Sequence, residues 1–215
     1  MRSKLACHAE IAARTTLLQR GYWYYRTCEA HGFGYWFGFA AAAGALLDDD
    51  ERARDWLTWI HSNIVDGLTH MPDDGIVEWP VFNPYWGVMT AAVLESLLGK
   101  RLAVEIPFLR GFADNIIPFS GTHGGSPMLR TMLIYLAARF QDARCQADAL
   151  RQPRPVKGVN FEPLALLLYD PSLTPSELSA IPDMFAAENG TVICRDTAGK
   201  TSFQFQCGVP LTPAK

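Results

Sequence analysis

Tyr85 is the residue of this sequence whose type and position best suit acid–base chemistry. It follows the pair Asn83-Pro84, which predicts the start of a helix because Asn is a good N-cap and Pro fits the first helical position. A phenol in the first turn feels the positive end of the helix dipole, which favours tyrosinate. An ordinary Tyr, with a pKa of about 10, is a poor base at neutral pH. The stretch therefore predicts an acid–base tyrosine; the alternative is an aromatic side chain that packs the preceding loop.

Acidic and aromatic residues precede Tyr85 in a loop that follows a Gly turn at 72–75. Glu78 could orient the phenol or simply cap this loop. Asp74 and Glu78 could also form the pair of carboxylates, about 5–10 Å apart, that a glycoside hydrolase requires. The aromatic side chains suit stacking on sugars and packing in a helical core equally well; they are Trp23, Tyr24, Tyr25, Tyr35, Trp36, Trp79, Phe82 and Trp86.

Further side chains have chemistry that suits an acidic sugar. His31 precedes a long apolar run, and His123 lies in the Gly-rich loop 119–125. Each could contact a substrate, although a packed core histidine and a solvated loop residue are the ordinary alternatives. Arg130 and Arg26 could pair a sugar carboxylate or sulfate through two parallel hydrogen bonds, where the alternative is a surface arginine without a specific role. The histidines lack the spacing of metal ligands, so we expect no metal and no other cofactor.

The composition is that of a globular protein with a sizeable core. The chain has 215 residues, of which 49% are hydrophobic and 19% charged. Its net charge of −3 gives no reason to expect nucleic acid or a membrane surface as a partner. The longest apolar run, 33–47, is too short to span a bilayer. The sequence contains neither a G-x-x-x-x-G-K motif nor a Gly-rich dinucleotide fingerprint.

The five cysteines are odd in number, widely spaced and without a C-x-x-C pair. This pattern argues against a disulfide framework and against a zinc cluster. Cys194 and Cys207 could face each other in a hairpin, but isolated buried thiols are the prediction.

Apolar periodicity predicts a mainly helical body followed by a small β element. Apolar residues repeat at helical spacing from Ala53 to Leu68, and Ser126-Pro127 marks an N-cap with Pro in the first turn. Polar and apolar residues alternate along 201–207, the period of a half-buried strand. Two strands alone are marginal in water, so a larger β domain is expected to begin here. The expected helices cover 5–19, 33–47, 53–68, 84–98, 104–117, a segment after Ser126-Pro127, and 161–168; the expected hairpin joins 190–195 and 201–207 through a turn at 196–200.

Four segments, taken in order, carry a family resemblance. They are His31-Gly32-Phe33-Gly34 with its apolar run; Asp74-Gly75, Glu78 and Tyr85-Trp86-Gly87; Leu167-Leu168-Tyr169-Asp170-Pro171; and Ile181-Pro182-Asp183-Met184 with Val192-Ile193-Cys194-Arg195 and Phe203-Gln204-Phe205-Gln206-Cys207-Gly208. No single motif is specific, but their order resembles the heparinase II/III-like polysaccharide lyases and their epimerase relatives over about residues 28–208.

The resemblance implies a fold in two parts. Residues 1–180 would be a portion of an alpha/alpha toroid, and residues 181–215 would be a short β-hairpin that begins a truncated β-sandwich. The resemblance also implies a periplasmic or secreted protein, although the first ten residues do not form a secretory signal because their apolar run is interrupted at once. An unpaired edge on the hairpin predicts self-association.

The resemblance implies β-elimination on glycans that contain uronic acid, such as heparan, chondroitin, dermatan or alginate. A base removes the C5 proton, an acid reaches O4, and the carboxylate is neutralised in the transition state. His31 matches the histidine that contacts this carboxylate. Tyr85 matches the tyrosine that serves as acid and, with some sugar geometries, as base. The candidate substrate contacts are Glu78, Trp86, Trp36, His123 and Arg130.

The sequence also departs from the family pattern. Val209-Pro210-Leu211-Thr212-Pro213 stands where the family has a His-rich stretch with further catalytic and metal-binding residues. Ala30 stands where some relatives have Asn, and Gly34 where the heparinase II branch has Glu. We therefore expect little or no turnover from residues 1–215 alone. The alternatives are a catalytically dead remnant that binds glycan, a uronate epimerase and a toroid glycoside hydrolase.

Overall fold

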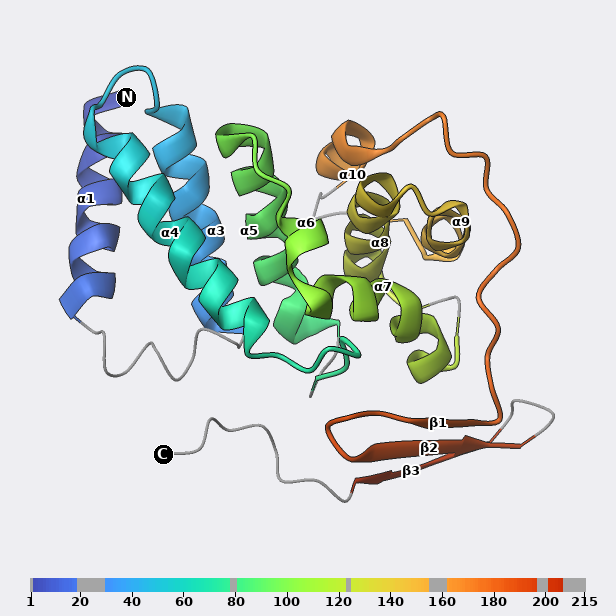
Figure 1. Cartoon of the computed structure of the whole chain (residues 1–215). Helices are drawn as coiled ribbons and strands as arrows, with labels where there is room; N and C mark the ends of the chain where they lie inside the picture. Colours follow the sequence, from blue (N-terminus) through green and yellow to red (C-terminus); the bar gives the residue numbers. More distant parts are fainter. Residues whose placement is uncertain are drawn as a thin grey trace. The chain divides into compact units, whose positions relative to one another are not determined.

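The computed structural model of this chain describes residues 2–18, 30–77, 81–122, 125–154, 162–196 and 201–206. Over these residues the protein is mainly α-helical, with nine helices and one three-stranded antiparallel sheet (Figure 1). The prediction of a helical body followed by a small β element is confirmed. The chain divides into two compact units, one made of residues 1–70 and 82–102 and the other of residues 71–81 and 103–215.

The first unit contains the helices α1 (Arg2–Leu18), α3 (Ala30–Ala45), α4 (Arg52–Thr69) and α5 (Phe82–Leu98). The apolar stripe expected over 53–68 is buried on one side of α4 and forms part of the core. Its buried members include Ala53, Trp56, Leu57, Ile60, Ile64 and Leu68. The long apolar run of α3 packs against both α4 and α5, as its apolar character on every side predicts.

Aromatic contacts show that α3 and α4 are antiparallel. Trp36 of α3 lies edge-on to Trp59 of α4, with ring centroids 4.9 Å apart. Phe39, one turn further along α3, lies 5.9 Å from Trp56, which comes one turn earlier in α4. Successive contacts move toward the C-terminus of α3 and toward the N-terminus of α4, so the two helices are antiparallel.

Two contacts show that α5 runs parallel to α3. The Phe37 ring lies 5.2 Å from the ring of Trp86, near the start of α5. Gly44, near the end of α3, lies so close to Leu97, near the end of α5, that an added Cβ would come within 2.5 Å of the leucine Cδ1. The order of contacts is the same in both helices, so α3 and α5 begin at the same end of this unit (Figure 1).

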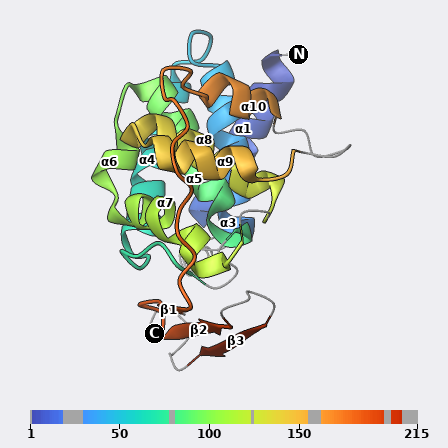
Figure 2. The same cartoon turned by 90° about the vertical axis from the view of Figure 1, so that its right-hand side faces the viewer.

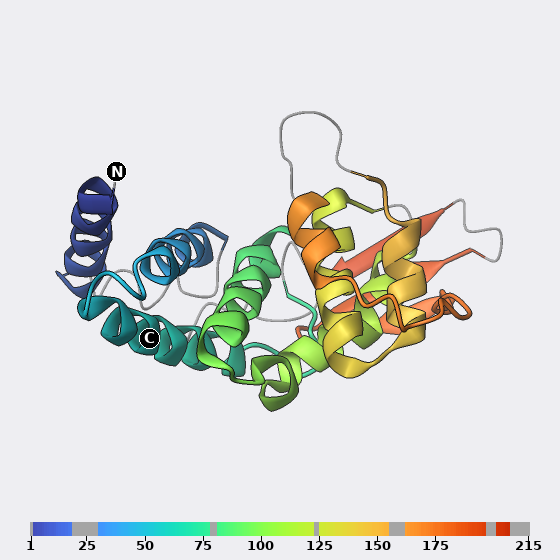
Figure 3. The same cartoon turned by 90° about the horizontal axis from the view of Figure 1, so that it is seen from above.

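The second unit contains four longer segments of helix and the sheet. After α6 (Leu102–Glu105), which begins at the unit boundary, come α7 (Pro107–Ser120), α8 (Pro127–Phe140), α9 (Ala143–Arg151) and α10 (Glu162–Leu168). The α8–α9 pair is an antiparallel hairpin (Figure 3). The Ser126 side chain accepts a hydrogen bond from the amide of Leu129 at 3.0 Å, so its predicted N-cap role is confirmed. Asp142 caps α9 in the same way, accepting from the amide of Cys145 at 2.9 Å.

The sheet consists of β1 (Met184–Ala186), β2 (Thr191–Arg195) and β3 (Ser202–Gln206) in that order. The predicted hairpin is confirmed, because β2 and β3 are antiparallel with Ile193 opposite Gln204. One face of the sheet lies against the end of α7, where the Phe185 and Phe119 rings meet edge-on at 5.9 Å (Figure 2).

Several predicted boundaries and burial patterns were wrong. The helix expected over 104–117 is interrupted at Ile106, because Pro107 starts a new helix as its first residue. Helix α5 begins at Phe82, so Asn83 lies inside the helix and does not cap it; Pro84 still falls in the first turn, where its missing N–H costs no helical bond. Sequence periodicity missed α9 and β1. It also predicted a half-buried β3, whereas all five β3 residues are exposed.

Candidate active site

The first turns of α3 and α5 carry the two residues expected to act on the substrate. His31 is the second residue of α3, and Tyr85 is the fourth residue of α5. Because these helices are parallel neighbours, both backbone positions lie at the same end of the first unit. The first amides of a helix have no intrahelical acceptor and carry partial positive charge, so this end favours an anionic group. The His31 side chain lies outside the described part of the chain, and its distance from the Tyr85 phenol stays a prediction.

The side chain of Tyr85 is buried. Its exposed fraction is 0%, and its ring lies edge-on to that of Trp86 with centroids 5.0 Å apart. Burial removes the water that would stabilise tyrosinate and raises the pKa of the Tyr85 phenol well above its ordinary value. The expectation of a phenol shifted toward tyrosinate is therefore wrong in direction, because desolvation raises its pKa. Tyr85 keeps its proton at neutral pH.

The candidate tryptophans belong to the aromatic packing of the first unit. Trp36 is 3% exposed and lies between helices α3 and α4. Trp86 is half-buried and touches the rings of Phe37 and Tyr85. Stacking on a sugar needs an accessible ring face, so Trp86 is the better placed of the two for that role.

Arg130 has a structural position in the second unit. It lies on α8 and is 7% exposed. Its Nη1 donates to the backbone carbonyl of Ala149, near the end of α9, at 3.1 Å. This carbonyl also accepts from the C-cap amide of Gln152, and carbonyls in the last turn of a helix carry partial negative charge, so the guanidinium stabilises this end of α9. Three of the other candidates, Glu78, His123 and Arg26, lie outside the described residues.

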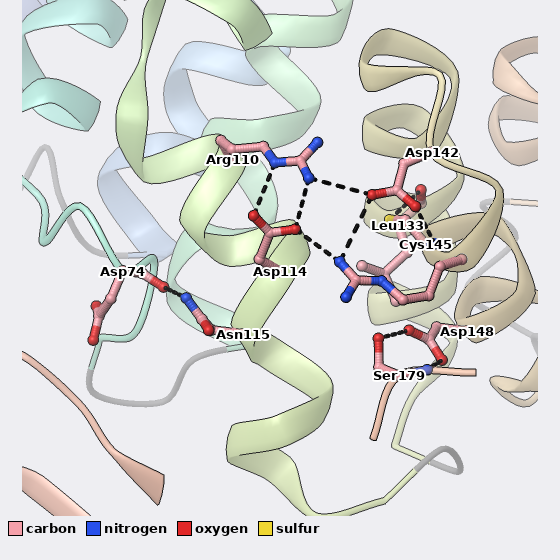
Figure 4. A network of polar contacts seen from close by, with 10 residues as sticks. Asp74, Arg110, Asp114, Asn115, Leu133, Asp142, Cys145, Asp148 and Ser179 are labelled. Carbon is pink, nitrogen blue, oxygen red and sulfur yellow. Dashed lines mark hydrogen bonds and ion pairs between the residues drawn. The ribbon is translucent and has the colours of Figure 1, made fainter. Parts of the chain in front are cut away.

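Both carboxylate oxygens of Asp74 accept hydrogen bonds from backbone amides of the second unit. Its Oδ1 accepts from the amide of Ile76 at 2.9 Å, and its Oδ2 accepts from the amide of Glu188 at 2.7 Å. Its own carbonyl accepts from Nδ2 of Asn115 on α7 at 3.0 Å (Figure 4). These bonds explain an acidic residue at this position without assigning it the role of a catalytic carboxylate.

The Gly75 turn lies directly on the backbone of α7. Gly75 has φ of +76°, and a Cβ there would stand 1.9 Å from the backbone nitrogen of Phe112. On the helix side, a Cβ at Gly111 would stand 1.9 Å from the Asp73 carbonyl oxygen. Only glycine on both sides permits this approach. The Asp74-Gly75 pair therefore has a structural explanation that the sequence alone did not provide.

A closed network of charges lies on the surface of the second unit (Figure 4). Asp114 accepts from Arg110 at 2.8 Å and from Arg144 at 2.9 Å. Asp142 lies within 3.5 Å of Arg110 and 3.8 Å of Arg144. Two positive and two negative groups balance within this network, so each of the two arginines already has carboxylate partners.

The cysteines are only partly as expected. Cys145 is buried, and burial raises the pKa of its thiol well above the ordinary value. Cys7 and Cys194 are exposed, so the prediction of buried thiols is wrong for these two. In the ranges that the structure describes, no group of three or more His, Cys, Asp or Glu side chains could hold a metal ion.

Comparisons with family models, with curated proteins and with solved structures returned no match. Among the described helices, none has both the length and the apolar character needed to cross a bilayer.

Proposed function

We propose that this chain is part of the alpha/alpha toroid of a lyase that cleaves uronate-containing polysaccharides by β-elimination. The main support is the parallel arrangement of α3 and α5, with α4 antiparallel beside α3. Toroids are built from such alternating helices. The same arrangement brings the first turns that carry His31 and Tyr85 to one end of the unit, where helix dipoles favour the carboxylate of a uronate.

In this proposal His31 and the helix amino termini neutralise the uronate carboxylate. A base takes the C5 proton, the C4–O4 bond breaks, and Tyr85 gives its phenolic proton to the leaving oxygen. Tyr85 is protonated before the reaction begins, as a general acid must be, but its raised pKa makes it a weaker proton donor than an ordinary tyrosine. The raised pKa also disfavours a resting tyrosinate as the base.

A second candidate is a toroid fragment that binds an acidic glycan without cleaving it. The observation that favours this candidate is the complete burial of Tyr85, because a catalytic acid must come within hydrogen-bond reach of its substrate. For the lyase to act, the side chains that cover the phenol must move aside.

Binding and turnover are tested separately on residues 1–215. The panel is heparan, chondroitin, dermatan and alginate, and each is assayed for binding by calorimetry and for turnover by absorbance of the new C4=C5 double bond. We expect saturable binding to at least one of these uronans, with little turnover. Failure to bind any of them would refute both candidates. Incorporation of solvent deuterium at C5 without a double bond would indicate an epimerase, and new reducing ends without a double bond would indicate a hydrolase.

Two variants assign the roles. His31→Ala should weaken uronan binding by about tenfold or more, as expected for loss of a charge-assisted contact. Tyr85→Phe should leave binding unchanged and abolish the residual turnover. The matched control is Tyr135→Phe, which alters a tyrosine that is equally buried but lies on α8 in the second unit. Equal effects from the two tyrosine variants would remove Tyr85 from the mechanism.

A further inference from the structure

The outer edge of β3 is not paired with any strand that the structure describes. In the order β1-β2-β3, the two edges belong to β1 and β3. Strand β1 has three residues and follows Pro182-Asp183. A short length, a proline and a charge each discourage an edge strand from pairing with another strand. Strand β3 has five residues, none of them charged or proline, and all are exposed. Of the two edges, β3 is the one open to another strand.

The hydrogen-bond pattern shows which backbone groups face this edge. The Asp196 amide donates to the Thr201 carbonyl at 3.0 Å, so these two residues form a hydrogen-bonded pair. Bonded and non-bonded pairs alternate along an antiparallel ladder, so the backbone groups of Phe203 and Phe205 point inward to β2. The N–H and C=O groups that point outward belong to Ser202, Gln204 and Gln206.

The β3 sequence, Ser-Phe-Gln-Phe-Gln, reads nearly the same in both directions about its centre, Gln204. If two copies pair antiparallel across a two-fold axis at Gln204, Phe203 of each copy stands opposite Phe205 of the other. Gln204 then stands opposite itself as a hydrogen-bonded pair, and the outward groups at both strand ends are used as well. Aromatic pairs directly opposite each other stabilise a sheet, and this register brings no like charges together.

The two phenylalanines also belong to an exposed apolar face of the sheet. Phe203 is 66% exposed and Phe205 is 51% exposed. Residues directly opposite in neighbouring strands share a face. The rows on this face are Met184, Cys194 and Phe203, and Ala186, Val192 and Phe205. Pairing of two β3 strands would join these rows to those of the second copy and partly cover the four phenylalanines.

We propose that β3 pairs with β3 of a second copy of this chain, antiparallel and in register about Gln204, to form a continuous six-stranded sheet. The proposal rests on the edge geometry and is independent of the lyase chemistry. The contact is small, because an aromatic side chain buries about 150–250 Å² at most and a standard interface buries about 800 Å² per partner. The dimer is therefore weak, with Kd of about 1 μM or above.

Sedimentation velocity over a concentration series tests the pairing with the full chain. The wild type should shift from monomer to dimer as concentration rises. Gln204→Lys and Gln204→Glu each place two like charges opposite each other at the axis, and each should raise the dimer Kd by about tenfold or more. An equimolar mixture of the two variants should restore dimerisation, because Lys then faces Glu. An unfolded variant could not produce this rescue.

A second comparison separates β3 from the rest of the sheet. Gln204→Pro removes the outward donor at the axis while leaving the inward bonds of Phe203 and Phe205 in place, so it should also abolish the dimer. The control Met184→Lys adds a charge on β1, at the other edge, and should leave the dimer unchanged. A wild type that stays monomeric at every concentration would overturn the proposal. The proposal would also fail if the Gln204 variants left the dimer Kd unchanged, or if mixing the Lys and Glu variants did not restore the dimer.

Discussion

Asp74 and Glu188 are linked by a side-chain-to-backbone hydrogen bond, and a second one links Glu188 to the preceding residue, Asp73. The Asp74 carboxylate accepts from the Glu188 amide at 2.7 Å, and the Glu188 carboxylate accepts from the Asp73 amide at 3.1 Å, although Asp74 and Glu188 are 114 positions apart. The Asp74 carbonyl is also bonded to Asn115 of α7. The turn before Tyr85 and the turn between β1 and β2 are thereby fixed to each other within the second unit.

Asp74→Ala should destabilise the protein by about 1–3 kcal/mol, because it leaves the amides of Ile76 and Glu188 without their acceptors. Urea unfolding followed by circular dichroism measures this change. The matched control is Asp73→Ala, which keeps the bonded amide and removes only an exposed carboxylate. Equal losses in the two variants would show that the Asp74 hydrogen bonds do not stabilise this turn.

Gly75→Ala should destabilise the protein by at least about 2 kcal/mol, because its Cβ would overlap the backbone of Phe112 and its φ is positive. Gly38→Ala is the control. Gly38 lies inside α3 with nothing within 4 Å of an added Cβ, so this change should stabilise the helix by about 0.5–1 kcal/mol. In thermal unfolding, the Tm of Gly75→Ala should therefore fall and the Tm of Gly38→Ala should rise. A wild-type Tm for Gly75→Ala would contradict the close approach of Gly75 to α7.

The raised pKa of Tyr85 predicts a loss of stability at high pH. In the unfolded chain the phenol loses its proton near pH 10, while in the folded protein it holds the proton to higher pH. The folded state therefore binds more protons above about pH 10, and the free energy of unfolding falls as pH rises through this range. Tyr85→Phe should show a shallower fall, measured by urea unfolding between about pH 9 and pH 11. An unchanged slope would mean that Tyr85 is accessible to solvent.

Two substitutions at Asp142 should separate its cap from its ion pairs. Asn is as good an N-cap as Asp, so Asp142→Asn should cost less than about 0.5 kcal/mol, and the cost should disappear in high salt because the arginine contacts are partly exposed. Asp142→Ala also removes the acceptor for the Cys145 amide and should cost about 1 kcal/mol more, at any salt concentration. Equal costs for the two variants would contradict the capping role.

Features that depend on neighbours in the sequence were predictable. Ser126 caps α8 because its side chain reaches an amide three residues on, and the α4 stripe follows from helical periodicity. The β2–β3 hairpin follows from alternation on either side of a short turn. Each of these is a local relationship, so sequence spacing contains it.

The sequence by itself therefore determined the mainly helical body, most helix positions and the terminal hairpin. Only the tertiary structure decided how buried each face is and what distant residues touch. The pKa of the Tyr85 phenol is raised because packing desolvates it, and the hydrogen bond from the Glu188 amide to Asp74 joins residues 114 positions apart. Phe203 and Phe205 are exposed because α7 packs against the opposite face of the sheet and no described strand covers the edge of β3. Long-range hydrogen bonds, and the burial of residues such as Tyr85 that no periodic stripe predicts, arise from the whole chain, and no local pattern encodes them.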